Sequence, residues 1–417
     1  MKEKIKVFVI SDHPFSPSGV GTQTRYMVEH LLSTGDYSFV CFGGAIKHED
    51  YNPQRHPEYG DDLIVYPVDG YGTQESVRSI IRTERPDMVW FMTDPRFFSW
   101  LWEIEDEIRS LVPMVYYHVW DNYPYPDYNK VWYDSTDVVV AISKLTHDIV
   151  QNVSPDVETH YLPHAVRPDA YKPLDEEEIL KLRHNSGIPD DKFVIFWNNR
   201  NARRKHPGTL VFWFKEFLDS VGHDKAKMIM HTDPNDVNGP NLVATIDKLG
   251  LVDGEVQFST QKLDFPQLAA LYNIADVTVN ISDAEGFGLS TLESLSCATP
   301  IIVTMTGGLQ EQVTNGEEWF GVGMEPAAKA VIGSQDIPYI YEDRVSKEDF
   351  LAALHKLYDM SREERRDLGL RGKAHVDNNY NFNDYTNKWD ELLKGVHKKY
   401  GSWDNRKAYK TWQLREI

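Results

Sequence analysis

The stretch DAEGFGLSTLESLSCATPII, residues 283–302, decides the fold class of this 417-residue chain. It follows VTVNIS at 277–282, a β-branched run that predicts a buried strand, and a helix is expected over Leu289–Cys297. PIIVTM at 300–305 then predicts the next strand. A strand that ends in a glycine loop and continues into a helix is the unit of a doubly wound parallel sheet. The stretch therefore predicts an α/β domain.

The same alternation of strand and helix extends over most of the chain. It predicts two Rossmann-like domains, 1–172 and 173–380, joined near the Pro-containing acidic segment Tyr171–Glu178, and a helical tail at 381–417. Two such domains in tandem are expected to face each other across a cleft, with ligands at the carboxyl ends of the strands. The further predicted strands are 6–11, 37–43, 62–68, 87–92, 112–119, 137–143, 192–199, 225–231 and 255–259. The further predicted helices are 22–32, 73–83, 99–111, 208–221, 241–249, 266–274 and 385–396.

Composition excludes several classes of protein. Hydrophobic residues make up 41% and charged residues 26%, which is typical of a globular protein rather than a fibrous or disordered one. No apolar run approaches the ~18 residues of a membrane span, and the N-terminus lacks the apolar core of a signal peptide. The two cysteines form no CxxC pair. We therefore expect a reducing, cytoplasmic location and no transmembrane segment.

The charge balance bears on partners. The net charge is −20, and residues 1–170 carry 14 Lys and Arg against 26 Asp and Glu. Duplex DNA and anionic membranes are bound by the opposite balance. The sequence thus argues against nucleic acid as a partner.

Residues 283–302 also supply the strongest candidate site. Gly286 and Gly288 allow a ligand to approach the backbone, and the helix that follows presents free N–H groups to phosphate or hydroxyl oxygens. Glu285 and Glu293 could each accept hydrogen bonds from sugar hydroxyls. The alternative is that Glu293 stabilises the start of its helix and Glu285 is a solvated loop residue.

A second candidate is WNNRNARRKHPG at 197–208, which concentrates positive charge just after a predicted strand. Arg forms forked hydrogen bonds to phosphate and Lys adds a compact charge, so the segment suits a diphosphate. A solvated basic turn is the alternative. No D-x-D, HExxH, GxSxG or GxxxxGK[ST] motif is present, so the sequence calls for no metal.

Three further segments follow predicted strands. PSGVGTQT at 17–24 lacks the third glycine of a dinucleotide fingerprint and is either a glycine loop facing a ligand or a tight turn needed for packing. YYHVWDNYPYP at 116–126 places His118 and Asp121 among aromatic residues, as a sugar site would, although a core histidine is equally consistent. In MTGGLQEQV, 305–313, Glu311 could bind a ligand or could equally be a residue that stabilises the start of a helix.

Taken together, these residues resemble a known family. EGFGLSTLE with SLSCATPIIV is similar to the Glu-x7-Glu signature and following helix of retaining GT-B glycosyltransferases, in particular family four. LAALYNIADVTVNIS, TGGLQEQV, VVVAISKLTHD, YLPHAVRPDAYKP and PSGVG resemble the surrounding segments of that family. Arg200 and Lys205 match its spaced basic pair. Three departures, Cys297-Ala298-Thr299, Lys205-His206 and the extra Arg203-Arg204, leave the donor sugar open.

The resemblance implies transfer of a sugar from a nucleoside diphosphate, UDP or GDP, to an acceptor hydroxyl with retained configuration and without metal or other cofactor. Arg200 and Lys205 would hold the diphosphate, Glu285 the transferred sugar and Glu293 the ribose, with His118 approaching from the first domain. The acceptor, whether glycan, lipid-linked or small, would bind that first domain. A GT-B sugar-nucleotide epimerase and an inactive binding protein are the alternatives. The donor-binding residues implied are Gly19, Gly21, Lys262, Leu263, Gly286, Phe287, Gly288, Leu289 and Glu293.

Overall fold

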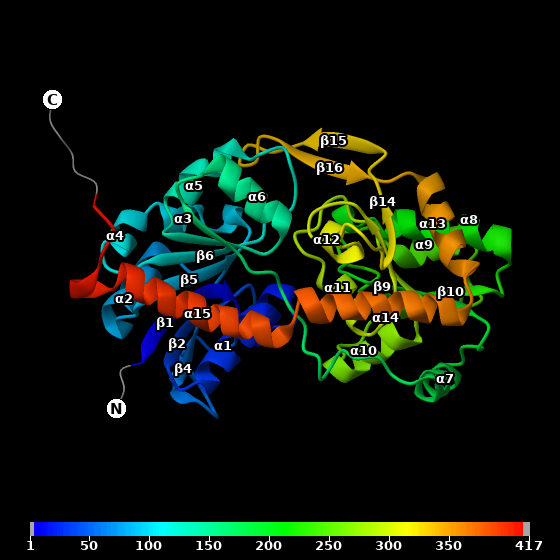
Figure 1. Ribbon diagram of the computed structural model, residues 1–417, viewed down its shortest axis with the longest axis horizontal. Helices are drawn as coiled ribbons and strands as arrows, with labels where there is room; N and C mark the ends of the chain where they lie inside the picture. The colour runs from blue at the N-terminus through cyan, green and yellow to red at the C-terminus, as the bar shows by residue number, and fades with distance from the viewer. Residues whose placement is uncertain (1–3, 412–417) are drawn as a thin grey trace. The chain divides into compact units, whose positions relative to one another are not determined.

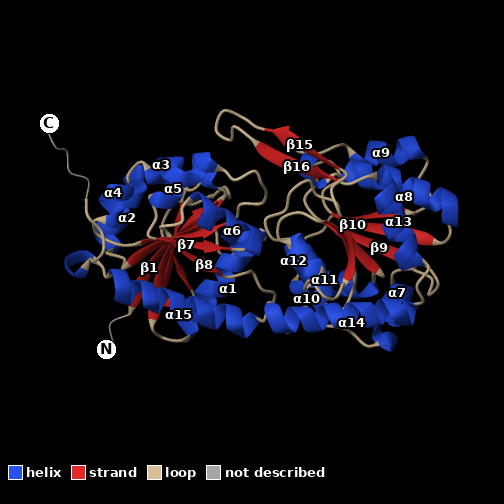
Figure 2. Cartoon of the chain, turned by 45° about the horizontal axis from the view of Figure 1, so that its top comes forward, coloured by secondary structure: helices blue, strands red, loops and turns tan. Residues whose placement is uncertain are grey.

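The computed structural model describes residues 4–411 and divides the chain into two compact units. Of the described residues, the first unit comprises 4–164, 334–338 and 383–411, and the second comprises 165–333 and 339–382. Each unit holds its own parallel sheet covered by helices, as Figures 1 and 2 show. The two predicted Rossmann-like domains are confirmed.

The first unit contains an eight-stranded sheet in the order β3-β4-β2-β1-β5-β6-β7-β8. Every neighbouring pair is parallel except β3 with β4. The strands are β1 Ile5–Asp12, β2 Tyr37–Gly44, β3 Gln54–His56, β4 Gly60–Pro67, β5 Met88–Thr93, β6 Met114–His118, β7 Val138–Ala141 and β8 Glu158–Tyr161. The helices are α1 Gly19–Ser33, α2 Gln74–Glu84, α3 Ser99–Trp102, α4 Glu105–Arg109, α5 Lys130–Asp134, α6 Lys144–Val153 and α15 Phe382–Tyr400. All of α15 except its first residue belongs to this unit.

Alternation along β5 explains how this sheet is covered on both faces. Trp90 contacts Trp389 of α15 edge to face, at 5.7 Å between ring centroids. Its neighbour Phe91 points to the opposite face, where it contacts Phe98 and Trp102. A period of two is what a strand buried on both sides requires. The tail therefore supplies core side chains to the first unit, and Trp389 is completely buried.

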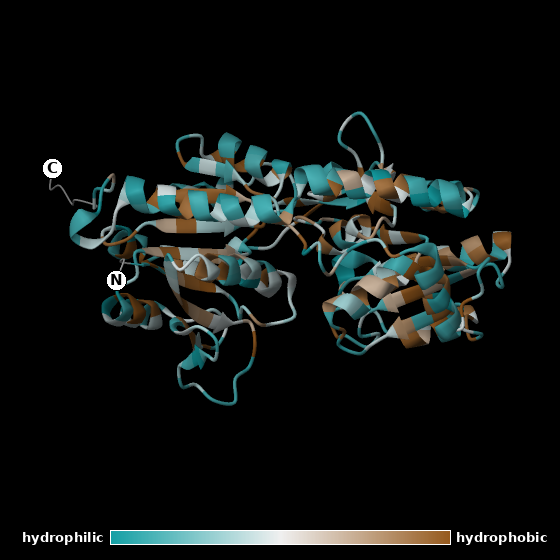
Figure 3. Ribbon diagram, turned by 60° about the horizontal axis from the view of Figure 1, so that its bottom comes forward, coloured by the Kyte–Doolittle hydropathy of each residue, from teal (hydrophilic) through white to brown (hydrophobic). Residues whose placement is uncertain are grey.

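The second unit contains a six-stranded parallel sheet in the order β11-β10-β9-β12-β13-β14 and a separate antiparallel hairpin, β15-β16. The strands are β9 Phe193–Asn198, β10 Ala226–His231, β11 Val256–Ser259, β12 Val277–Asn280, β13 Ile301–Thr304, β14 Gly321–Met324, β15 Ala328–Ile332 and β16 Ile340–Arg344. The helices are α7 Glu176–Asn185, α8 Pro207–Val221, α9 Leu242–Leu249, α10 Phe265–Ile274, α11 Leu289–Ser296, α12 Leu309–Val313, α13 Lys347–Tyr358 and α14 Arg362–Asn379. In Figure 3 hydrophilic and hydrophobic residues alternate along the outer helices, as expected of helices that cover a sheet.

The structure divides the chain earlier than the predicted boundary at 172. His164 is buried in the first unit and hydrogen-bonded to Tyr117, whereas Tyr171 packs on Tyr272 in the second. The acidic run expected in the linker begins helix α7 instead. Asp175 caps that helix by accepting from the backbone of Glu178, and acidic residues stabilise a helix N-terminus.

The helix predicted over 99–111 is wrong as one element, because the structure has two short helices, α3 and α4. Residues 103 and 104 separate them, and Trp102 packs on Tyr116 at 5.3 Å between ring centroids. No Pro or Gly marks the break in the sequence. Among residues 4–411 no helix is both long and apolar enough to cross a membrane.

Candidate active site

The loop at residues 282–288, here the EGFG loop, connects β12 to α11 at the carboxyl end of the second sheet. Gly288 has φ of +91°, which favours glycine, and a Cβ there would collide with Leu309. Hydrogen bonds from helix α12 and from Gly308, the residue before it, hold the backbone of the loop. Gly308 donates to the carbonyl of Glu285 at 3.1 Å, and Gln312 donates to that of Phe287 at 2.7 Å. The loop is therefore held in one conformation behind the Glu285 side chain.

The segment 199–206, here the basic turn, lies directly beside the EGFG loop. It follows β9, and β9 pairs with β12, so both segments leave the same edge of the sheet. The amide of Asp283 donates to the carbonyl of Arg204 at 2.9 Å. His206 and Asp283 also interact through their side chains. Sheet order thus brings together two segments about 80 residues apart.

Lys205 and Glu285 form an ion pair at the junction of these segments. Their side chains are 8% and 14% exposed. The guanidinium of Arg204 lies 3.9 Å from the same carboxylate and donates to the carbonyl of Ala284. In low-dielectric surroundings an ammonium and a carboxylate interact strongly, which fixes both side chains. The structure therefore brings together the two residues predicted for the diphosphate and the sugar.

Glu293 lies in the second turn of α11, on the side of α10. Its carboxylate accepts a hydrogen bond of 2.6 Å from the hydroxyl of Tyr272, which itself accepts one of 2.8 Å from Asn198. Burial raises the pKa of Glu293 to about 7, against the opposing effect of the hydroxyl groups of Tyr272 and Tyr171. This residue is consequently a carboxyl group that changes charge near neutral pH.

The structure gives Arg200 a partner outside the EGFG loop. Its guanidinium binds Asp236 at 2.7 Å, and its side chain is 67% exposed. The Arg predicted from spacing thus has another partner, and Arg204 is the one beside Glu285. Lys262 is exposed and Leu263 partly buried, in the loop that follows β11.

In the first unit His118 lies in the interior, and its contact with a sugar stays a prediction. Its side chain has no exposed surface, and Nε2 lies 2.7 Å from the hydroxyl of Tyr133. Burial lowers the pKa of His118 to about 3, so the ring is neutral. This burial agrees with the alternative drawn from the sequence, a core histidine.

Gly21 has a structural explanation within α1. A Cβ at this position would collide with Ser16 and the carbonyl of His13, and its amide donates to the Ser18 hydroxyl that caps the helix. Gly19 is exposed at the start of the same helix. The packing role first considered for this loop is thus present, and contact of either glycine with a ligand stays a prediction.

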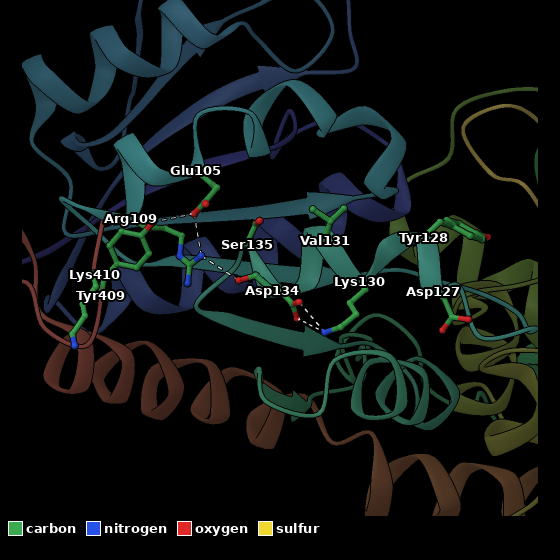
Figure 4. Close-up of a pocket in the computed structure, with 10 residues that line it drawn as sticks. All are labelled: Glu105, Arg109, Asp127, Tyr128, Lys130, Val131, Asp134, Ser135, Tyr409 and Lys410. Carbon is green, nitrogen blue, oxygen red and sulfur yellow. Dashed lines mark hydrogen bonds and ion pairs between the residues drawn. The ribbon is translucent and has the colours of Figure 1, made fainter. Parts of the chain in front are cut away.

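A cavity of about 650 Å³ in the first unit contains none of the predicted site residues (Figure 4). Ionised side chains of both signs line it, and several of them pair with each other. Arg109 binds Glu105 at 3.0 Å, and Lys130 binds Asp134 at 2.8 Å. Its lining therefore has no dominant charge that would select an anion or a cation.

No group of three or more His, Cys, Asp or Glu side chains within residues 4–411 is arranged to hold a metal ion. Protein side chains carry positive charge beside the EGFG loop. Arg204 and Lys205 lie beside Glu285 of the loop, while Glu342 binds Arg203 and Asp283 interacts with the His206 ring. Sequence reasoning missed Asp283, Tyr272 and Glu342 as members of this site. Tyr272 and Glu342 carry no short-range signal, because each reaches the site through the tertiary fold. Asp283 lies within the EGFG loop itself, and its side-chain partner His206 comes from the basic turn.

Comparison with known proteins identifies the region that carries this site. Residues 178–375 match the family Glycosyl transferases group 1. D-inositol 3-phosphate glycosyltransferase 2 of Catenulispora acidiphila is 29% identical over 187 residues, 42% of this chain and 42% of that protein. Alpha-galactosylglucosyldiacylglycerol synthase of Streptococcus pneumoniae is 23% identical over 239 residues, 54% of this chain and 57% of that protein. The chain thus spans less than two thirds of the length of these curated relatives.

Solved structures extend the likeness to nearly the whole chain. Sucrose-phosphate synthase from Thermosynechococcus elongatus superposes with a TM-score of 0.74 at 17% identity, covering 95% of this chain and 100% of that one. Anabaena HepE in complex with UDP-glucose gives 0.71 at 15% identity, covering 94% and 99%. At these identities the likeness establishes the fold, and the predicted GT-B fold is confirmed.

Proposed function

Because residues 178–375 belong to the glycosyl transferases group 1 family, we propose that this protein is a retaining glycosyltransferase that uses a nucleoside-diphosphate sugar. The resemblance to family four drawn from the Glu-x7-Glu signature is confirmed by that match. The relatives and structures named above are glycosyltransferases and synthases, and none of them is an epimerase.

One observation carries the proposal: Lys205 and Glu285 meet at the junction of the basic turn and the EGFG loop. In a sugar nucleotide the distal phosphate is esterified to the anomeric carbon, so the phosphate and the sugar hydroxyls lie within a few ångströms of each other. A site for this ester needs a cation and a hydroxyl-binding acceptor side by side. The buried pair supplies both groups, and Glu293 in the next helix supplies a second acceptor for the ribose.

In the proposed reaction the acceptor oxygen attacks the anomeric carbon from the face on which the phosphate leaves. The bond between that carbon and the phosphate oxygen breaks, and the acceptor's proton passes to the departing phosphate. Lys205, with Arg204 beside it, would stabilise the negative charge that develops on the diphosphate. Glu285 would hold the sugar hydroxyls, so that the retained configuration follows from the shared face rather than from a protein nucleophile.

UDP-sugars are the first donors to test, since a structural neighbour was solved with UDP-glucose. The acceptor is a hydroxyl compound whose identity the site residues of the second unit do not specify. A cytoplasmic location stays a prediction.

Incubation with a panel of UDP- and GDP-sugars, with and without a mixture of hydroxyl acceptors, tests the proposal. We expect release of nucleoside diphosphate and, with a suitable acceptor, a product heavier by one glycosyl residue in mass spectrometry. Conversion of the donor to an epimer would instead identify an epimerase. Absence of transfer, hydrolysis and nucleotide binding across the panel would refute the proposal.

A further inference from the structure

The hairpin β15–β16 is an addition to the second unit rather than part of its sheet. It lies between β14 and α13, and its strands pair only with each other among the described strands, from Ala328 with Arg344 to Ile332 with Ile340. Figure 1 shows it projecting from the unit near the label of β14. A doubly wound sheet does not need such a hairpin to complete its core, so its contacts indicate what it does.

The end of β16 is bound to the EGFG loop through the backbone. The amide of Asp343 donates to the carbonyl of Asp283 at 2.9 Å, and the amide of Asp283 donates to the carbonyl of Arg204 at 2.9 Å. Two consecutive backbone hydrogen bonds thus connect the hairpin, the loop that carries Glu285 and the turn that carries Lys205. Arg344 adds a charged contact, 4.0 Å from the carboxylate of Asp283.

Glu342 strengthens this connection from the same strand. Its side chain is 4% exposed and binds the guanidinium groups of Arg203, at 2.8 Å, and Arg344. Although burial acts to raise it, these two cations hold the pKa of Glu342 below its usual value, so the group is ionised at neutral pH. An ionised carboxylate inside the protein is kept there by its partners.

The basic turn needs such a partner because three cations follow one another in it. Arg203, Arg204 and Lys205 occupy one turn of 3-10 helix, where like charges repel. Glu342 draws Arg203 toward the hairpin, and Glu285 binds Lys205 on the other side. The backbone amide of Arg203 donates to the carbonyl of Asn238 at 3.0 Å, whereas its side chain is 68% exposed and, among the described residues, forms its ion pair with Glu342.

We propose that Glu342 is a positioning residue that holds the basic turn so that Lys205 meets the distal phosphate of the donor. This inference rests on the proposed glycosyl transfer and deepens it. Glu342 itself would not touch the substrate. It would act through Arg203 and the turn, and the hairpin would be a part of the donor site that lies outside the Glu-x7-Glu signature.

The test compares Glu342→Gln with the matched control Glu325→Gln, which changes an exposed carboxylate just after β14. Binding of UDP, GDP and the corresponding monophosphates is measured by calorimetry, and turnover is measured with the best donor of the panel. We expect Glu342→Gln to weaken diphosphate binding at least fivefold and to lower kcat about tenfold, while monophosphate binding changes less than twofold. The control should match the wild type in all of these, because Glu325 is exposed and no ion pair among the described residues joins it to the turn.

A purely structural role predicts a different result, namely equal weakening of monophosphate and diphosphate. The double variant Arg203→Gln with Glu342→Gln further distinguishes the positioning role from a purely structural one. If Glu342 acts by holding Arg203, the second change adds little to the first. Should Glu342→Gln fail to fold, the exposed Arg203→Gln alone gives the answer, with a loss of kcat expected.

Diphosphate binding and kcat equal to the control in Glu342→Gln, or in Arg203→Gln, would overturn the inference and leave the proposed function intact. A wild-type protein that binds no nucleotide would refute the proposed function and this inference with it. The two failures are therefore distinguishable in one series of measurements.

Discussion

Replacing Glu293 with Gln should raise the KM for the nucleotide-sugar donor about tenfold at pH 8 and very little at pH 6. The reason is the position of the carboxyl group, which accepts from Tyr272 at 2.6 Å in surroundings that raise its pKa to about 7. The ionised form would accept stronger hydrogen bonds from the ribose hydroxyls than the protonated form, so donor binding in the wild type should follow the ionisation of this residue.

The magnitude follows from the titration. With a pKa of about 7 the ionised fraction rises from about one tenth at pH 6 to about nine tenths at pH 8. Hydrogen bonds to an ionised acceptor are roughly twice as strong as neutral ones, so two of them lose about 1–3 kcal/mol when Gln replaces the carboxylate. A loss of about 1.4 kcal/mol corresponds to a tenfold change in affinity. A sugar nucleotide has no terminal phosphate monoester to titrate in this range.

The assay is the initial rate of transfer as a function of donor concentration at several pH values from 6 to 8. Wild-type KM should fall as the pH rises, and the KM of Glu293→Gln should stay flat. Glu317→Gln, which changes an exposed carboxylate, is the control. A wild-type KM independent of pH, or a Gln variant with wild-type KM at pH 8, would refute this account of Glu293.

Stability gives a readout of the same group without any ligand. Burial raises the folded pKa of Glu293 to about 7, above the ordinary 4.5 of an unfolded chain, so the folded state binds the proton more tightly. The residue therefore costs the wild type stability as the pH rises from 4.5 to 7. Glu293→Gln should unfold at a higher temperature than the wild type at pH 8, and this advantage should vanish near pH 4.5. An equal melting temperature at pH 8 would contradict the assigned environment.

Three further outcomes are expected from the same site. Glu285→Gln should lower kcat more than tenfold, a loss of at least ~1.4 kcal/mol, because the sugar it would hold develops charge in the transition state, and steady-state kinetics with an unchanged kcat would exclude that role. Lys205→Ala should weaken nucleoside diphosphate binding more than monophosphate binding, and calorimetry showing equal losses would remove Lys205 from the distal phosphate. Turnover should survive EDTA, because Arg204 and Lys205 supply positive charge at the diphosphate, and a rate lost on chelation and restored by Mg²⁺ or Mn²⁺ would show that a metal is required.

The local pattern of residues 277–305 was enough to predict the strand, the EGFG loop and the helix, and with them an α/β domain, whereas the GT-B fold followed from the resemblance to a known family. Periodicity and glycine placement are properties of neighbouring residues, so they can be read along the chain. The same holds for Glu285, Glu293 and the basic turn, which follow predicted strands. The general rule that ligand sites lie at the carboxyl ends of parallel strands was then enough to place these residues in a candidate site.

Which side chains meet at that edge depended on contacts between distant parts of the chain. The family resemblance singled out Arg200, yet Asp236 holds it and Arg204 lies beside Glu285. Glu342 reaches Arg203 across 139 residues, by way of a hairpin that no local pattern connected to the site. His118 had the residue type for a sugar contact but lies fully buried. Burial, ion pairing and shifted pKa values arise from what the fold places around a side chain, and a one-dimensional pattern carries no record of those neighbours.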